Sequence, residues 1–223
     1  MSWTGNNKIE IETALRHFEI TPTCNNAVGV ASAYYSGVGT MYAKWRQNHW
    51  RFDYLIKSLW WRSKALAYAV QSAQTFLLDL KFSDEEKPTA DSVDVLCSVF
   101  YRLGRSRHNK EAKALLSYMQ SQPPAWSWHT RAFLLMHEVR FGMKVMTDEL
   151  EQEVVSLAKS IAHAAALEHL DGGGISLYGQ VSRIYRNLAN LLPESHPRRA
   201  QYMKKSLDLA KRFNIVDQVL KAQ

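Results

Sequence analysis

The sequence predicts an all-α protein of about eight or nine main helices. Along most of the 223 residues, apolar side chains recur at intervals of three and four, which places them on one face of a helix. No segment alternates apolar and polar residues for long enough between turn signals to predict a sheet. Short runs rich in proline, glycine and polar residues separate the helical segments from one another.

Composition and charge narrow the class of protein. Apolar residues make up 46% of the chain and charged residues 22%, which excludes wholesale disorder. The net charge of +7 is concentrated in residues 41–80 and 173–223, and basic segments attract anionic partners. The two cysteines, Cys24 and Cys97, have no metal or redox spacing, so we expect thiols in a reducing, cytoplasmic compartment.

The N-terminal third is predicted to hold a short helix and a long helical pair. Residues 1–7 are polar, without a signal peptide, and we expect a loose tail there, followed by a helix over residues 8–18. Residues 20–43 carry no charge, but they are rich in small and polar residues, which favours burial in protein over a membrane span. Residues 26–46 and 50–80 predict two helices, although one long helix over 40–80 is the competing interpretation.

Small residues form a stripe on each of these two helices. Gly29, Ala33 and Gly37 recur at intervals of four, and so do Ala65, Ala69 and Ala73. We therefore expect the two stripes to face each other in a close helix crossing. The acidic, proline-ended run at residues 84–88 is the predicted boundary between domains at 1–82 and 90–223.

Residues 91–121 predict a helical hairpin. Asp91 and Ser92 are candidate N-caps for a first helix that ends at Gly104, where we expect a positive φ. Residues 105–109 form a polar connection to the second helix, which residues 123–124 stop with two prolines. Such a hairpin cannot bury both apolar faces alone and needs neighbouring helices. The apolar residues of its two faces are Val93, Leu96, Phe100, Leu103, Ala112, Leu115, Leu116 and Met119.

This hairpin resembles a tetratricopeptide repeat with a lengthened inner turn. The motif FYRLGR at 100–105 carries the first-helix packing positions and the turn glycine, and Cys97 occupies the small-residue position. The usual tryptophan and closing proline of that family are absent. The resemblance implies a tetratricopeptide-like α-α superhelix, and an irregular helical bundle with the same apolar spacing is the alternative.

The remaining chain predicts further helices of the same plan. One runs over residues 126–143, and Thr147 caps the next, which residues 171–174 terminate. A last hairpin spans 175–192 and 197–213, and residues 215–221 predict a capping helix. The acids Glu149, Glu151 and Glu153 are interpreted as a solvated helix start.

No motif points to catalysis, a cofactor or a metal. There is no phosphate loop, dinucleotide glycine pattern or serine elbow. His137-Glu138 begins like a zinc protease motif, but Phe141 stands where the second histidine belongs. The expectation is therefore a non-enzymatic protein without cofactor or metal.

The leading hypothesis for function is a protein–protein interaction module, such as an adaptor, chaperone or regulatory scaffold. The resemblance places the first helix of each pair along a groove, whose arginines suit an acidic partner segment. The alternative is a nucleic-acid-binding helical protein that uses the basic segments 41–80 and 173–223. In the first segment Trp50, Trp60 and Trp61 alternate with cations and could stack bases, although such tryptophans are more often core anchors. The predicted groove residues are Tyr101, Arg102, His137, Arg140, Arg183, Arg186 and Asn190.

Overall fold

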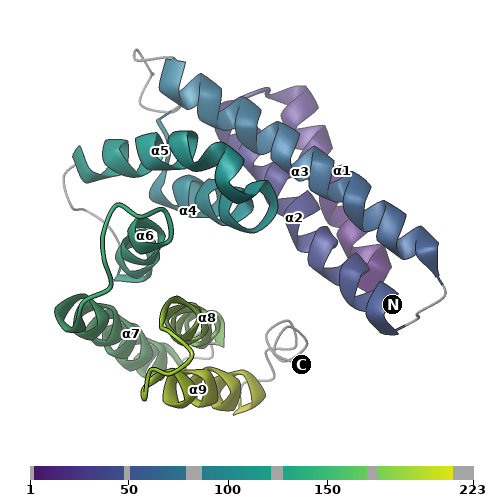
Figure 1. Ribbon diagram of the computed structural model, residues 1–223. Coiled ribbons are helices and arrows are strands. Elements are labelled where there is room, and N and C mark those ends of the chain that lie inside the picture. Colours follow the sequence, from purple (N-terminus) through teal and green to yellow (C-terminus); the bar gives the residue numbers. More distant parts are fainter. Residues whose placement is uncertain (1–2, 48–50, 79–86, 122–127, 170–174, 213–223) are drawn as a thin grey trace. The chain divides into compact units, whose positions relative to one another are not determined.

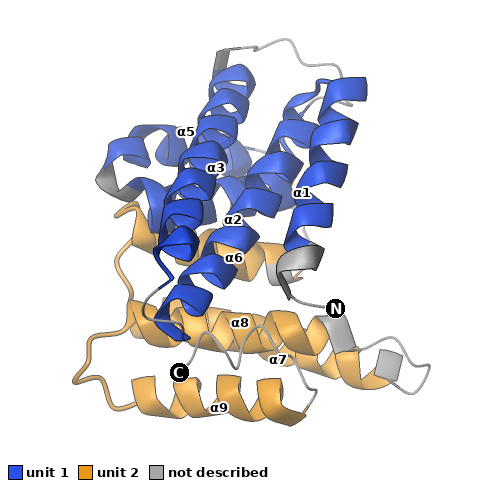
Figure 2. Cartoon of the chain, turned by 90° about the vertical axis from the view of Figure 1, so that its right-hand side faces the viewer, with its two compact units in different colours: residues 1–122 blue, residues 123–223 orange. Residues whose placement is uncertain are grey.

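The computed structural model describes residues 3–47, 51–78, 87–121, 128–169 and 175–212. Within these ranges it contains nine α-helices, one π-helix and one 3-10 helix, and no strand. The predicted all-α fold is confirmed. The chain divides into two compact units, residues 1–122 and residues 123–223 (Figure 2). The tetratricopeptide-like superhelix stays a prediction.

Unit 1 is built around a pair of long helices, α2 (Cys24–Gln47) and α3 (Phe52–Leu78). They make the most extensive helix contact of the chain, and α1 (Trp3–Ile20) packs on α2 (Figure 1). The segment predicted at 40–80 therefore holds parts of two packed helices and not one long helix, and residues 48–50 between these helices lie outside the described residues. Helix α1 begins at Trp3, so the predicted loose tail over 1–7 is wrong from that residue onward.

The contact between α2 and α3 is close but differs from the predicted pairing of small-residue stripes. Ala65, Ala69 and Ala73 are fully buried, as that pairing requires. Gly37 packs under the indole of Trp61, where an added Cβ would lie 2.4 Å from Cε3. Gly29 is exposed, with nothing within 4 Å of such a Cβ. The predicted pairing is therefore wrong at Gly29, and at Gly37 the contact is made by the ring of Trp61.

The rest of unit 1 is an unbroken helical path. Helix α4 (Ala90–Val99) leads into the π-helix η1 (Phe100–Gly104), the 3-10 helix η2 (Arg105–His108) and α5 (Asn109–Ser121). The N-cap is Thr89 and not Asp91 or Ser92, because its hydroxyl accepts the Ser92 amide at 3.1 Å. Among the described glycines only Gly142 has a positive φ, so the positive φ expected at Gly104 is absent.

Side chains tie α4 and η1 to the first two long helices. Ser92 Oγ donates to Asn25 Oδ1 at 2.7 Å, and Arg62 donates to the carbonyl of Leu103. The division between the units lies after residue 122, and not in the acidic run at 84–88 where the sequence places it. A charged, proline-ended run indicates a linker in a sequence, but these contacts keep the helices on its two sides in one unit.

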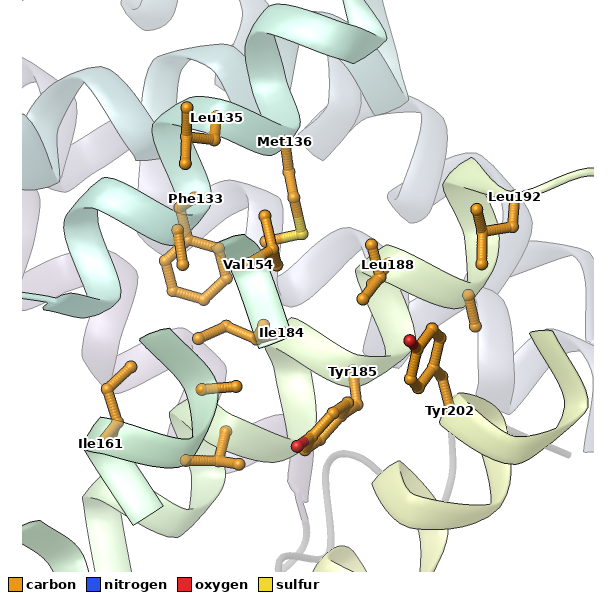
Figure 3. Close-up of a cluster of buried hydrophobic side chains, with 14 residues drawn as sticks. Phe133, Leu135, Met136, Val154, Ile161, Ile184, Tyr185, Leu188, Leu192 and Tyr202 are labelled. Atoms are coloured by element: carbon orange, nitrogen blue, oxygen red, sulfur yellow. The ribbon is translucent and has the colours of Figure 1, made fainter. Parts of the chain in front are cut away.

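Unit 2 comprises α6 (Trp128–Arg140), α7 (Asp148–His169), α8 (Ile175–Leu191) and α9 (Arg199–Arg212). Its core gathers Phe133 and Met136 of α6, Val154 and Ile161 of α7, and residues from α8 and α9 (Figure 3). Thr147 caps α7 as predicted, with its hydroxyl accepting the Leu150 amide at 3.2 Å. The predicted capping helix at 215–221 and the glycine run at 172–174 lie outside the described residues.

Candidate functional site

A row of exposed apolar side chains lies along the first half of α3. Phe52, Ile56, Leu59 and Trp60 have exposed fractions of 60, 67, 54 and 51%. Their intervals of four, three and one place them on the same face of the helix. The buried residues Trp61, Ala65 and Ala69 lie on the opposite face, so α3 is apolar on both sides. We call these four residues the α3 row; an exposed apolar patch of this kind marks an interaction site.

Cationic side chains flank the α3 row. Lys64 Nζ lies 5.7 Å from the ring centroid of Trp60, and Lys57 Nζ lies 5.0 Å from that of Trp61. Such cation–π contacts hold the ammonium groups beside the aromatic rings. Arg62 stands on the other edge of the row. The row therefore combines an apolar centre with basic borders.

Local contacts set the charge and position of the row's first turn and of Trp60. Arg51 makes two hydrogen bonds of 3.0 Å to Asp53, and they lower the pKa of that carboxyl. The paired carboxylate offsets only the charge of Arg51. Tyr34 packs edge-on against Trp60 with ring centroids 6.0 Å apart, and burial, followed by Tyr68, raises the pKa of its phenol. Trp60 is thus anchored on one side and exposed on the other.

A pocket of about 660 Å³ opens where α3 meets η1 and η2. It lies entirely within unit 1 and continues the α3 row, since Leu59 belongs to both. Three of its eight lining residues are basic and none is acidic. The lining residues are Leu59, Arg62, Ser63, Leu66, Leu103, Gly104, Arg107 and His108.

The π-helix η1 contributes Leu103 and Gly104 to the wall of this pocket. A π-turn interrupts the regular i to i−4 bonding of a helix, and such turns are frequent at functional sites. Here the carbonyl of Leu103 accepts Nε and Nη2 of Arg62, at 3.2 and 2.6 Å. Gly104 leaves room for the neighbouring ring, since an added Cβ would lie 2.7 Å from His108 Cδ2. The glycine at 104 thus serves close packing and not a left-handed turn.

The predicted groove residues are distributed over both units. Tyr101 and Arg102 are exposed on η1, which contacts α3. In unit 2, Asn190 is exposed and Arg140 is half-buried, whereas His137 and Arg186 are buried and offer a partner little or no exposed surface. The reason at His137 is that residues 132–138 of α6 are all buried, so that α6 has no free face over that span.

Arg183 is the arginine of unit 2 with the clearest packing role. Its guanidinium carbon lies 3.9 Å from the ring centroid of Phe133, so it covers the apolar core of unit 2. A cation in this position contributes packing as well as charge. The arginines that the sequence groups together therefore differ in what they contact.

The second notable cluster surrounds Glu151 at the start of α7. This carboxylate is 2% exposed, so its interpretation as part of a solvated helix start is wrong. Tyr202 Oη donates to Oε1 at 2.5 Å, Arg198 Nε lies 3.1 Å from the same oxygen, and His196 Nε2 lies 3.9 Å from Oε2. Burial, and then the bond to Glu151, raises the pKa of Tyr202 to about 12. The cluster joins α7 to the α8–α9 connection and α9.

The Glu151 cluster is closed by its own partners. Arg198 also pairs with Asp148, whose hydrogen bond raises the arginine pKa. Within the described ranges, no three His, Cys, Asp or Glu side chains are grouped so that they could hold a metal ion. The Glu151 cluster therefore has a structural role, and the α3 row with its pocket is the candidate site.

The sequence singles out the tryptophans of residues 50–61, but it does not distinguish Trp60 from Trp61 or reveal the role of Ile56 and Leu59. The available signal is a second apolar stripe on α3, opposite the alanines. Two apolar faces on one helix indicate that one of them packs inside and the other remains for a neighbour.

Comparisons with known proteins identify no relative. No family model matches the chain, and neither a curated protein nor a solved structure matches it. No helix in the described part of the chain carries an apolar stretch long enough to cross a bilayer.

Proposed function

We propose that the chain is a non-enzymatic protein-interaction module that binds an amphipathic, acidic helix of a partner protein along α3. The observation that carries the proposal is the α3 row: four large apolar side chains, each more than half exposed, on one face of a regular helix. A helix is the occupant that matches such a row, because its own apolar residues recur at the same intervals.

The borders of the row support an acidic occupant. Lys57, Lys64 and Arg62 stand beside the apolar centre, and Tyr101 and Arg102 are exposed on η1, which contacts α3. Carboxylates of a bound helix would pair with these cations while its apolar face covers the row. Roles such as adaptor, chaperone or regulatory scaffold all use a surface of this kind.

Site-specific photo-crosslinking tests the occupant. A photoreactive phenylalanine analogue replaces Ile56 in one variant of the full chain. In a second, control variant the analogue replaces Gln152, an exposed residue on α7. We expect position 56, and not 152, to crosslink in native lysate to a protein segment with helical apolar periodicity and an excess of acids. Crosslinks from position 56 to lipid, to nucleic acid or to no molecule would contradict the proposal.

A binding measurement with the identified segment completes the test. A synthetic peptide of that segment should bind the wild type, and Ile56→Asp should weaken binding by at least tenfold, as expected for a central interface residue. Ile20→Asp is the matched control, because Ile20 is also exposed but lies at the end of α1. Equal affinities for the two variants would exclude the α3 row as the binding surface.

Nucleic acid is the competing ligand, because Trp60 and Lys64 could stack a base and neutralise a phosphate. Salt separates the two classes. Affinity for a single strand falls steeply and linearly with the logarithm of salt concentration, whereas an interface centred on apolar residues changes little. A steep slope with an oligonucleotide, and no peptide binding, would replace the proposed function with the alternative.

A further inference from the structure

The pocket beside η1 has a chemistry of its own. Its wall is apolar at Leu59, Leu66 and Leu103, and cationic at Arg62 and Arg107. With no acidic side chain in the lining, the pocket suits an anion attached to an apolar group. Its volume of about 660 Å³ exceeds what a single water or small ion needs.

The two guanidinium groups differ in what they already bind. Arg62 uses Nε and Nη2 on the carbonyl of Leu103, which fixes the side chain at the pocket wall. Arg107 is exposed and makes no hydrogen bond or ion pair with any described residue. Arg107 can therefore offer a two-pronged donor to a ligand, with Arg62 as a fixed second charge.

The histidine of the lining adds a buried polar atom. Its Nδ1 is inaccessible and lies 3.7 Å from Glu111 Oε1, which is beyond hydrogen-bond distance. The ring packs against Phe100, with centroids 5.2 Å apart, and the absent Cβ of Gly104 admits it to that place. His108 therefore acts as a fixed edge of the pocket.

We propose that this pocket binds a carboxylate carried next to an apolar group of the partner segment, with the carboxylate on Arg107 and the apolar group against the leucines. This inference rests on the proposed function and deepens it. Since Leu59 belongs to both the row and the pocket, the anchored carboxylate would set the register of the partner helix on α3. The carboxylate comes either from an acidic side chain or from the end of the partner chain.

Small probes test the pocket without a partner protein. N-acetyl-leucine represents a chain terminus, acetyl-Leu-Glu-amide represents an acidic side chain, and N-acetyl-leucinamide lacks the charge. Each is titrated into the full-length protein while the Nε–Hε signals of Arg62 and Arg107 are followed by NMR. We expect one or both carboxylate probes to shift these signals and the uncharged amide to leave them unchanged. The carboxylate probe that binds identifies the source.

Three variants locate the binding. Arg107→Gln should weaken binding of the carboxylate probe by about tenfold, the effect of losing a charge-assisted hydrogen bond. Ser63→Trp, at an exposed position of the lining, should abolish binding by filling the pocket. Lys110→Gln removes an exposed positive charge outside the lining and should change nothing.

The outcomes separate this inference from the proposed function. Equal binding of the uncharged amide, equal effects of Arg107→Gln and Lys110→Gln, or no shift with any probe would overturn the pocket assignment. Ile56→Asp should leave probe binding unchanged, because Ile56 is not in the lining. Probe binding without any crosslinked segment at position 56 would refute the proposed function and keep the pocket assignment. A crosslinked acidic helix without probe binding would keep the proposed function and refute the pocket assignment.

Discussion

In unit 1 the main helix pair packs through small and aromatic residues, whereas in unit 2 a buried carboxylate of α7 binds the α8–α9 hairpin. Gly37 admits the indole of Trp61 between α2 and α3. In unit 2, Glu151 gathers Tyr202 and Arg198 at the entrance to α9, and Ser182 Oγ donates to the carbonyl of Ser206 at 2.8 Å. The first arrangement depends on shape and the second on satisfied polar groups.

The two units also differ in whether their charged side chains are paired inside the unit or exposed on its surface. Unit 2 pairs a buried carboxylate with donors from its own chain, which leaves little there for a ligand. Unit 1 buries apolar residues on one face of α3 and leaves cations and a second apolar face outside. The contacts to the connecting segments also differ. In unit 2 the carboxylate of Glu151 binds side chains of the α8–α9 connection, whereas in unit 1 Arg62 donates to a backbone carbonyl of η1 beside an open pocket.

The largest expected effect is the removal of the carboxylate in unit 2. Glu151→Leu leaves the buried Tyr202 hydroxyl without its acceptor and Arg198 with Asp148 as a partner. It removes two hydrogen bonds to a charged group, each of which contributes about 1.5–3 kcal/mol. Urea unfolding measures the loss. Glu153→Leu is the control, because its partner Arg131 is more than half exposed and such a pair contributes about 0–1 kcal/mol. Equal losses of unfolding free energy in the two variants would show that the Glu151 cluster does not stabilise unit 2.

The close approach in unit 1 is tested by two glycines of α2. Gly37→Ala places a Cβ against Trp61, and overpacking of this kind destabilises by about 1–3 kcal/mol. Gly29→Ala, in the same helix but with open space around it, should stabilise by about 0.5–1 kcal/mol through helix propensity. Thermal unfolding of both variants gives the comparison, and a shift of the same sign in both would refute the assigned packing.

A smaller effect is expected at the π-helix. Arg62→Met keeps much of the side-chain volume but leaves the Leu103 carbonyl without its two guanidinium bonds, at a cost of about 1–2 kcal/mol. Arg62→Lys should recover part of the loss, because an ammonium can donate one of the two bonds. Chemical denaturation orders the three proteins. A lysine variant less stable than the methionine variant would mean that packing, and not the carbonyl, holds Arg62.

The last expected effect is confined to alkaline pH and is absent at neutral pH. The pKa of Tyr202 is raised from 10.0 to about 12, so the neutral phenol is favoured in the folded protein. Its contribution to stability is complete below pH 10 and is lost as pH rises from about 10 to about 12, because the unfolded chain releases the proton first. Urea unfolding at several pH values should show a shallower alkaline decline for Tyr202→Phe. An identical decline in wild type and variant would contradict the raised pKa.

Local signals account for much of the helix pattern. Apolar spacing at three and four predicts the helices, and Thr147 is read correctly as a cap because the capping bond joins residues three apart in the chain. Element ends are harder to place: Thr89 and not Asp91 caps α4, since threonine and aspartate are both favoured N-caps and stand two residues apart. The candidate site is predicted only in part, through the tryptophans of 50–61 and the exposed Tyr101 and Arg102.

The sequence by itself determined that this chain is helical and basic, because helical periodicity follows from neighbours three or four residues apart and net charge follows from composition. Only the tertiary structure decided which face of α3 is buried, that Glu151 lies inside, and that Arg62 reaches Leu103, 41 residues away in the chain. Periodicity places residues on a common helix face but carries no information on what covers that face. The pocket and the α3 row depend on such long-range contacts, and so does the choice between an exposed and a buried charge.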